Sequence, residues 1–212
     1  MNVIMSEVSE LSQINTSVDP DVYLNHLRSR RSIRKFTNEA LTEDEVRKII
    51  EAGRYSPTGG NRQNVSYYVS RKNVSGIKNM IYEELKKLGE KAKAEGDKSA
   101  VYAGMWLKMY DEYKKNGTDR LFFDAGTVIF ISSDSLQSAC IAAAHMETMI
   151  YSMGLGMLYS GFTSRAVAYS EKLQDYLHLK EGYKVHAVLV VGHSNVQYER
   201  TVPRKPADVI WN

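Results

Sequence analysis

The sequence predicts a single domain that combines helices and strands. Its 212 residues are 43% hydrophobic and 25% charged, which is enough apolar side chain for one well-buried core. Apolar residues recur at helical spacing in some stretches, and short β-branched runs bounded by turn residues occur in others. Lys and Arg number 28 against 25 Asp and Glu, so any strongly basic surface must be local.

Two helices are expected in the first quarter of the chain. The first covers about residues 21–28. Its buried side would consist of Val22, Leu24 and Leu27. The second begins at Thr42, which forms a capping-box pattern with Glu45, and ends before Pro57.

The later helices differ in composition. Residues 74–119 are rich in Lys, Glu and Tyr, and they predict two or three surface helices. Breaks are expected at Gly89, Gly96 and Gly117. The stretch from Ser135 to Gly154 is apolar on nearly every side, which predicts the central buried helix of the core.

Three strands are expected, in VSYYVS (65–70), in 127–132 and in YKVHAVLVVGHS (183–194). Residues 1–18 are expected to form a loose tail and 19–212 the domain. The chain ends in an extended segment with two prolines.

The single cysteine, Cys140, excludes a disulfide framework, a thiolate zinc site and a cysteine-ligated iron–sulfur cluster. It favours a reducing, cytoplasmic location, and Cys140 itself is expected to be a small core residue. The N-terminus has an early acidic residue and no continuous apolar run, so neither a secretory signal nor a membrane span is expected.

Two partial motifs do not carry function. His145-Met146-Glu147 matches half of the zinc-deaminase signature, but the other half needs two cysteines, so no metal site is expected. Gly154-Leu155-Gly156 follows a helix, whereas a dinucleotide-binding glycine motif follows a strand. Gly154 is therefore expected to cap the preceding helix.

RRSIRKF concentrates positive charge around Arg31. A solvated basic face and a nucleic-acid patch are two interpretations, and the balanced net charge makes the second the weaker. A third is a discrete phosphate, because guanidinium groups match phosphate oxygens and Ser32 adds a hydroxyl. Arg204 and Lys205, held between prolines, would add further cations.

The loop TGGNRQN supplies amides suited to a heterocycle or a sugar chain. Asn61 and Gln63 each carry a donor and an acceptor, although an ordinary helix-to-strand loop explains the same residues. Gly161, in LYSGF, would let a flat ligand approach the backbone. Together these pieces imply a phosphate, a polar spacer and a planar ring, which are the parts of FMN.

The sequence resembles the nitroreductase family of flavoproteins. Four stretches carry the resemblance in order, from Arg30 to about Asp208: RRSIRKF, SPTGGNRQN, GLGMLYSGF, and VVGHSN with VPRKPADVIW. The first resembles the family's Arg-Arg-Ser-x-Arg-x-Phe element and the second its Ala-Pro-Ser-x-x-Asn-x-Gln-Pro loop.

The resemblance implies an α+β fold with a central, mostly antiparallel sheet, in a homodimer that exchanges C-terminal tails and builds two FMN sites. The phosphate and ring edge would be held by Arg30, Arg31, Ser32, Arg34, Arg204 and Lys205. The partner subunit would contribute Pro57, Thr58, Gly59, Asn61 and Gln63. Ser160 and Gly161 would present backbone N–H groups to flavin N5 and O4.

The chain also departs from the family pattern. Asn64-Val65 replaces the usual Pro-Trp, and Gly59-Gly60 replaces bulkier residues, which implies a more open pocket. Some relatives carry a ferredoxin-like domain in front, whereas the short tail here has no cysteine. A ferredoxin donor would therefore be a separate protein.

The activity implied is transfer of a hydride from NAD(P)H through flavin N5 to a nitroaromatic, a quinone or a related small acceptor. One pocket serving both half-reactions predicts ping-pong kinetics without an essential side-chain acid or base. Residues 74–119 would form a lid. Its candidates for the substrate wall are Met105, Trp106, Tyr110 and Tyr113, which packing on the core explains equally well.

Two alternatives remain open at this point. A flavin-binding redox sensor or a ferredoxin-fed reductase would bind FMN and turn over NAD(P)H slowly. A nucleic-acid-binding domain would be colourless and would bind DNA or RNA with steep salt dependence.

Overall fold

The computed structural model describes residues 5–37, 39–96 and 100–212. They form two compact units. The central unit is Arg31–Glu199, and the terminal unit consists of the two chain ends, up to Arg30 and from Arg200. Each unit is described by itself.

A four-stranded sheet forms the centre of the central unit. Its strands, in the order β1 (Val65–Ser70), β2 (Thr127–Ser133), β4 (Lys184–Gly192) and β3 (Gly156–Tyr159), are all antiparallel to their neighbours. The predicted α+β class with an antiparallel sheet is confirmed. So are the three predicted strands, whereas β3 is too short to show a clear alternation in the sequence.

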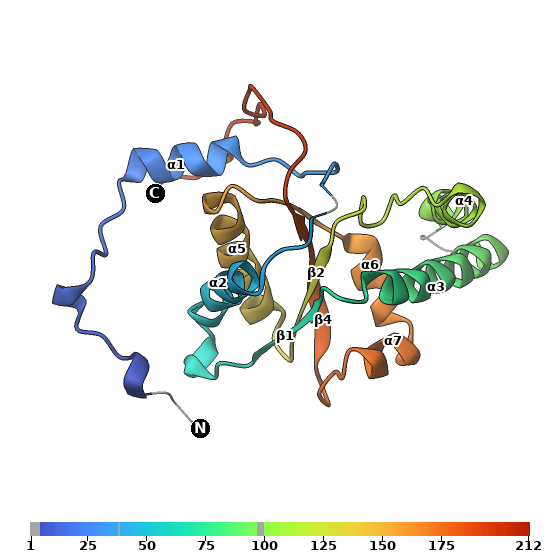
Figure 1. Ribbon diagram of the computed structural model, residues 1–212, viewed down its shortest axis with the longest axis horizontal. Helices are drawn as coiled ribbons and strands as arrows, with labels where there is room; N and C mark the ends of the chain where they lie inside the picture. Colours follow the sequence, from blue (N-terminus) through green and yellow to red (C-terminus); the bar gives the residue numbers. More distant parts are fainter. Residues whose placement is uncertain (1–4, 38, 97–99) are drawn as a thin grey trace. The chain divides into compact units, whose positions relative to one another are not determined.

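Helices cover both faces of this sheet (Figure 1). One face carries α2 (Glu43–Arg54) and α5 (Leu136–Ser152). The other carries α3 (Val74–Glu95), α4 (Ala100–Asn116), α6 (Gly161–Ala168) and α7 (Glu171–Tyr176). Alternate strand residues separate the two cores, because Ile129 packs with the α2–α5 layer and Phe130 with the α3–α4 layer.

Local signals placed α2 correctly. Thr42 Oγ1 accepts from Glu45 N at 3.2 Å, and Glu45 Oε2 accepts from Thr42 N at 2.7 Å, so the predicted capping box is confirmed. The break expected at Gly89 is wrong. A Cβ there would lie 3.2 Å from the backbone oxygen of Ala103, so this glycine lets α3 and α4 approach closely. Gly96 does end α3, in the left-handed region at φ +64°.

The predicted burial of α5 is only half right. Its inner side is buried through Ala139, Ala142 and Met146. Its outer side exposes Leu136 (58%) and Ile141 (38%). The helix therefore presents an apolar surface to solvent within this chain.

The terminal unit contains α1 (Pro20–Ser29), with short 3-10 turns at Met5–Glu7 and Leu11–Gln13 before it. Asp19 caps α1 by accepting from the backbone N of Val22 at 2.8 Å. The predicted buried side is wrong, because Val22, Leu24 and Leu27 are 67%, 42% and 44% exposed. Residues 201–212 have no regular secondary structure, as expected for the tail.

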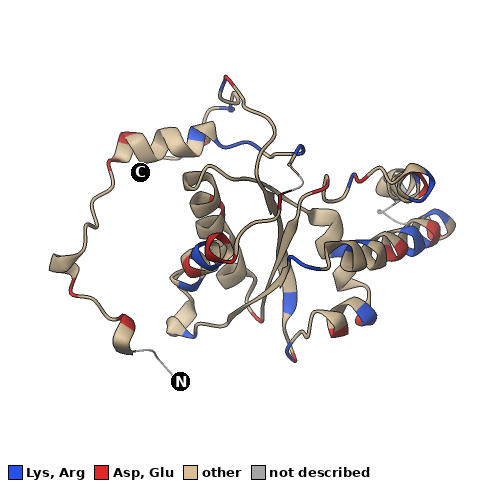
Figure 2. Ribbon diagram, in the orientation of Figure 1, with Lys and Arg blue, Asp and Glu red and all other residues tan. Residues whose placement is uncertain are grey.

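Charges of both signs alternate along α3 and α4 (Figure 2). Lysines and glutamates pair one turn apart, with N···O distances of 3.7–3.9 Å. These pairs are Lys86–Glu90, Lys91–Glu95 and Lys108–Glu112. This surface is therefore ion-paired and not uniformly basic. None of the described helices is both long enough and apolar enough to cross a membrane.

A buried carboxylate organises the turn that leads into β2. Asp119 has a fully buried side chain and accepts from Lys78 Nζ at 2.8 Å. It also accepts from the backbone N of Leu121, Phe122 and Asp124 at 2.9–3.2 Å. Burial acts to raise the pKa of Asp119, but the bond from Lys78 and those from the backbone outweigh it, so the pKa lies below its usual range.

We expect Asp119→Asn to lower the free energy of unfolding by about 3–5 kcal/mol at neutral pH, because it leaves the Lys78 ammonium without its counter-charge. Folding lowers this pKa, so the contribution is present above the unfolded value of about 3.9 and is lost as pH falls through the lower folded value. Urea unfolding of wild type and variant from pH 7 to pH 2 should show the gap closing below about pH 4. Glu43→Gln, on an exposed ion pair, should leave stability nearly unchanged, and an equal loss in both variants would contradict the role of Asp119.

Candidate functional site

The arginine-rich segment lies along the outer edge of β3. Ser32 forms a parallel bridge with Met157, and the backbone N of Ile33 donates to the carbonyl of Met157 at 2.9 Å. Phe36 forms an antiparallel bridge with Ser194, just beyond β4. The segment is therefore fixed to the sheet by its backbone.

Two glycines make this close seating possible. Ile33 and Phe36 are only 4% and 7% exposed. A Cβ on Gly156 would lie 2.7 Å from Ile33, and one on Gly192 would lie 3.0 Å from Phe36, so larger residues would push the segment off the sheet. With the apolar residues buried, Arg34 remains exposed and Ser32 half-buried, as an anion site requires.

Arg31 is oriented by an aromatic ring that the sequence did not indicate. Its guanidinium carbon lies 4.2 Å from the ring centroid of Tyr198, a cation–π contact. The other three predicted cations, Arg30, Arg204 and Lys205, belong to the terminal unit. Their part in an anion site stays a prediction.

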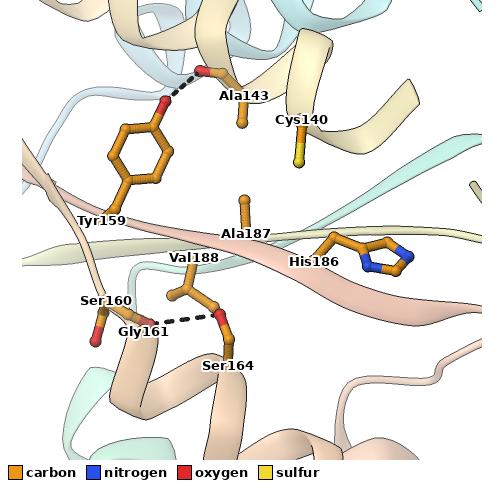
Figure 3. A pocket seen from close by; sticks show the side chains of 9 residues that line it. All are labelled: Cys140, Ala143, Tyr159, Ser160, Gly161, Ser164, His186, Ala187 and Val188. Atoms are coloured by element: carbon orange, nitrogen blue, oxygen red, sulfur yellow. Dashed lines mark hydrogen bonds between the residues drawn. The ribbon is translucent and has the colours of Figure 1, made fainter. Parts of the chain in front are cut away.

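A cavity of about 280 Å³ opens where β3 ends and α6 begins (Figure 3). Its walls come from α5, from β4, and from the end of β3 with the start of α6. They comprise Cys140, Ala143, Tyr159, Ser160, Gly161, Ser164, His186, Ala187 and Val188. The expectation that Cys140 is a core residue is wrong, because it is exposed and lines this cavity.

Of the two predicted backbone donors at this cavity, Gly161 fits. Ser160 N donates to the carbonyl of Val188 at 2.9 Å, so this N–H group is already used within the sheet, and its predicted role toward a ligand stays a prediction. Gly161 is the first residue of α6, where backbone N–H groups have no acceptor within the helix. A Cβ on Gly161 would meet nothing within 4 Å, so the space beside its backbone is open.

A β-bulge brings a histidine to the same cavity. Ile131 pairs with Ala187 and Ser132 pairs with Val185, which leaves His186 as the extra residue. Its Nε2 lies 3.1 Å from the carbonyl oxygen of Ser133, and because a carbonyl oxygen only accepts, Nε2 donates in this contact. No sequence signal indicated this residue, because the bulge depends on pairing with a distant strand.

The arginine-rich segment and the cavity lie at different points along the same strand, β3. Ser32 is bridged to Met157, and Ser160 follows three residues later, which corresponds to roughly 10 Å of extended chain. Two of the predicted pieces, one for an anion and one for a planar group, are thus brought to the same edge of the sheet.

The predicted amide loop is not brought to this edge. Pro57 to Gln63 precede β1, whereas Gly161 follows β3, and these are the two opposite edge strands. Three inter-strand spacings amount to about 14 Å. Asn61 and Gln63 are exposed, so they are available to a second molecule.

The predicted substrate wall is mostly core. Trp106 is 1% exposed, and the ring of Tyr113 stacks on Tyr82 at 4.3 Å. The hydroxyl of Tyr110 donates to Glu83 at 3.1 Å. Only Met105 remains substantially exposed (44%), so the packing interpretation is confirmed for Trp106 and Tyr113.

Comparison with known proteins gives a consistent result. The model of the nitroreductase family matches residues 27–193, which include RRSIRKF, the loop before β1 and the whole sheet. The comparison with curated proteins gave no match.

Solved structures with the same fold include two nitroreductases with bound FMN. The one from Bacteroides fragilis NCTC 9343 is 20% identical, with 89% of this chain and 98% of that chain covered at a TM-score of 0.65. The one from Desulfitobacterium hafniense DCB-2 is 25% identical, with the same coverage and a TM-score of 0.64. A BluB-like flavoprotein from Clostridium difficile 630 is 17% identical, again with 89% and 98% covered, and has a TM-score of 0.68.

The chain's only thiol, Cys140, lines the cavity, so its rate of alkylation can show whether a ligand fills the cavity. If FMN fills the space beside Gly161, alkylation of Cys140 by iodoacetamide should be about tenfold slower at ten times the Kd of FMN, because only the free fraction reacts. Mass spectrometry of the intact protein over time measures the rate. Riboflavin and AMP serve as controls for the ring and the phosphate, and a rate that does not change with FMN would place the ligand elsewhere.

Proposed function

Because this chain belongs to the nitroreductase family of FMN-dependent oxidoreductases, we propose that it passes a hydride from NAD(P)H through N5 of a bound FMN to a small oxidised acceptor, such as a nitroaromatic or a quinone. The observation that carries the proposal is the spacing along β3. The arginine-rich segment is bridged to Met157 through Ser32, and Gly161, with open space beside its backbone, lies just beyond the end of the strand.

The residues present fit FMN. Ser32, Arg34 and the ring-oriented Arg31 supply donors suited to a phosphate. Gly161 supplies the first backbone N–H of α6 and lines the cavity, and open space where a side chain would stand leaves room for the edge of a flat ring. The roughly 10 Å between the two groups suits a ribityl chain.

Bound FMN would accept and release hydride at N5, and the protein supplies its position and its electrostatic surroundings. Gly161 would hold the ring edge through its N–H group. His186 also lines this cavity, where the first-turn N–H groups of α6 add partial positive charge. With a single cavity at this place, donor and acceptor would bind in turn, which leads to ping-pong kinetics.

A homodimer would complete this site. The loop with Asn61 and Gln63 lies at the opposite sheet edge from Gly161, so a second copy is the simplest way to bring both to one ligand. Apolar surface supports the same assembly. It is exposed on α1, on α5 and in the C-terminal tail, where Ile210 and Trp211 are both 89% exposed. We propose that a second copy of the chain covers it and that the tails are exchanged.

The first test is an anaerobic visible spectrum of the protein with FMN after desalting. We expect flavin absorbance to be retained, to bleach with NADH or NADPH and to return on adding a quinone or a nitroaromatic. Bleaching only by a reduced ferredoxin would identify that protein as the electron donor. Retained flavin that no donor reduces would indicate a sensor, and loss of all flavin on desalting would contradict the proposal.

Substitution tests the anion site. Arg34→Ala and Arg204→Ala should each weaken FMN binding by about 1.5–3 kcal/mol, the range for hydrogen bonds to charged groups. Lys35→Ala is the matched control. Lys35 is a cation next to Arg34 in the sequence, but it stands at a variable position of the family element. Quenching of flavin fluorescence gives each Kd. Unchanged values for both arginine variants would remove the phosphate assignment.

A further inference from the structure

The loop before β1 is held in an unusual backbone conformation. Asn61 and Gln63 have φ values of +53° and +51°, and Gly60 between Gly59 and Asn61 has φ +58°. Side chains other than glycine rarely adopt this left-handed region, and they do so where the surroundings hold them. The question is which contacts hold this loop.

Asp134 lies in the turn between β2 and α5. It binds Arg62 and Asn64, which alternate along the chain with the left-handed residues Asn61 and Gln63. Its Oδ2 accepts from the guanidinium of Arg62 at 2.5 Å, and its Oδ1 accepts from the side-chain amide of Asn64. Asn61 and Gln63, which alternate with these two residues, are exposed on the surface of the loop.

Two further bonds fix the ends of the loop. The backbone N of Gln63 donates to Thr58 Oγ1 at 2.9 Å, and Ser133 Oγ donates to the carbonyl of Asn64 at 2.7 Å. Asn64 is 8% exposed and stands where the family motif has a proline. A proline restricts the backbone by its ring, whereas here the restriction comes from the bond between Asn64 and Asp134.

The geometry points to Asp134 as a positioning residue: it holds the 58–64 loop so that Asn61 and Gln63 face a ligand bound by the partner subunit. This inference rests on the proposed function. Asp134 does not touch the ligand in this role; it acts through Arg62 and Asn64.

The test is a cycle of FMN affinities. Asp134→Ala should raise the Kd of FMN about tenfold, if the loop then adopts the bound conformation about a tenth of the time. In an Asn61→Ala/Gln63→Ala background the same change should alter Kd less than about twofold, because no contact remains to be positioned. Arg62→Ala should have a smaller effect, and Glu51→Ala, which breaks an exposed ion pair in the preceding helix, should have none.

Hydrogen exchange without FMN gives a second readout. The amide of Gln63 should exchange about tenfold faster in Asp134→Ala, since opening of the loop exposes it. An unchanged exchange rate, an unchanged Kd, or an equal rise in Kd in the Asn61→Ala/Gln63→Ala background would overturn the inference while leaving the proposed function intact. Failure of the wild type to bind FMN would overturn both.

Discussion

The site depends on the way two apolar side chains fix a cationic segment to a sheet edge. The segment RRSIRKF carries four cationic side chains, and charged groups are more stable in water than beside a buried strand. Its charges therefore do not explain why it lies there. Ile33 and Phe36 solve this, because they enter the core over Gly156 and Gly192 and leave the polar residues between them outside. The backbone bond from Ile33 to Met157 then fixes the segment in register with β3, and thereby with the cavity at the strand's end.

Local sequence signals predicted the elements whose stability is local. The capping box at Thr42 and the β-branched runs of β1, β2 and β4 were found in place, because each pattern contains its own physical cause. Contacts between distant segments were not predicted. Gly89 lies within α3, where α4 packs closely against it, and His186 reaches the cavity because β4 has one residue more than β2 at the bulge. The candidate site could be predicted only in part, because some of its residues are brought there by contacts between distant segments. Ser32, Arg34 and Gly161 could be identified from their own chemistry, whereas Tyr198, Cys140 and His186 could not.

Errors about burial have a common direction. The apolar residues of α1 and the outer face of α5 were assigned to the core of one chain, yet both are exposed in it. A sequence pattern shows that a surface avoids water, but it does not show whether the same chain or another copy covers it. In the homodimer proposed above, a second copy of the chain would cover both surfaces.

Two carboxylates have different roles: Asp119 stabilises the fold, and Asp134 is inferred to position a loop for ligand binding. Asp119 is buried, and its bonds satisfy a lysine and several backbone groups, so it fixes the chain that enters β2. Asp134 lies just past the far end of the same strand, at the surface, and its two bonds hold a loop whose backbone is otherwise unfavourable. Removing the first would leave a buried charge uncompensated, which affects the whole fold. Removing the second would release local strain, which costs the fold little and affects only a function that needs the strained conformation. The two ends of β2 thus separate what keeps the domain folded from what arranges its ligand contacts.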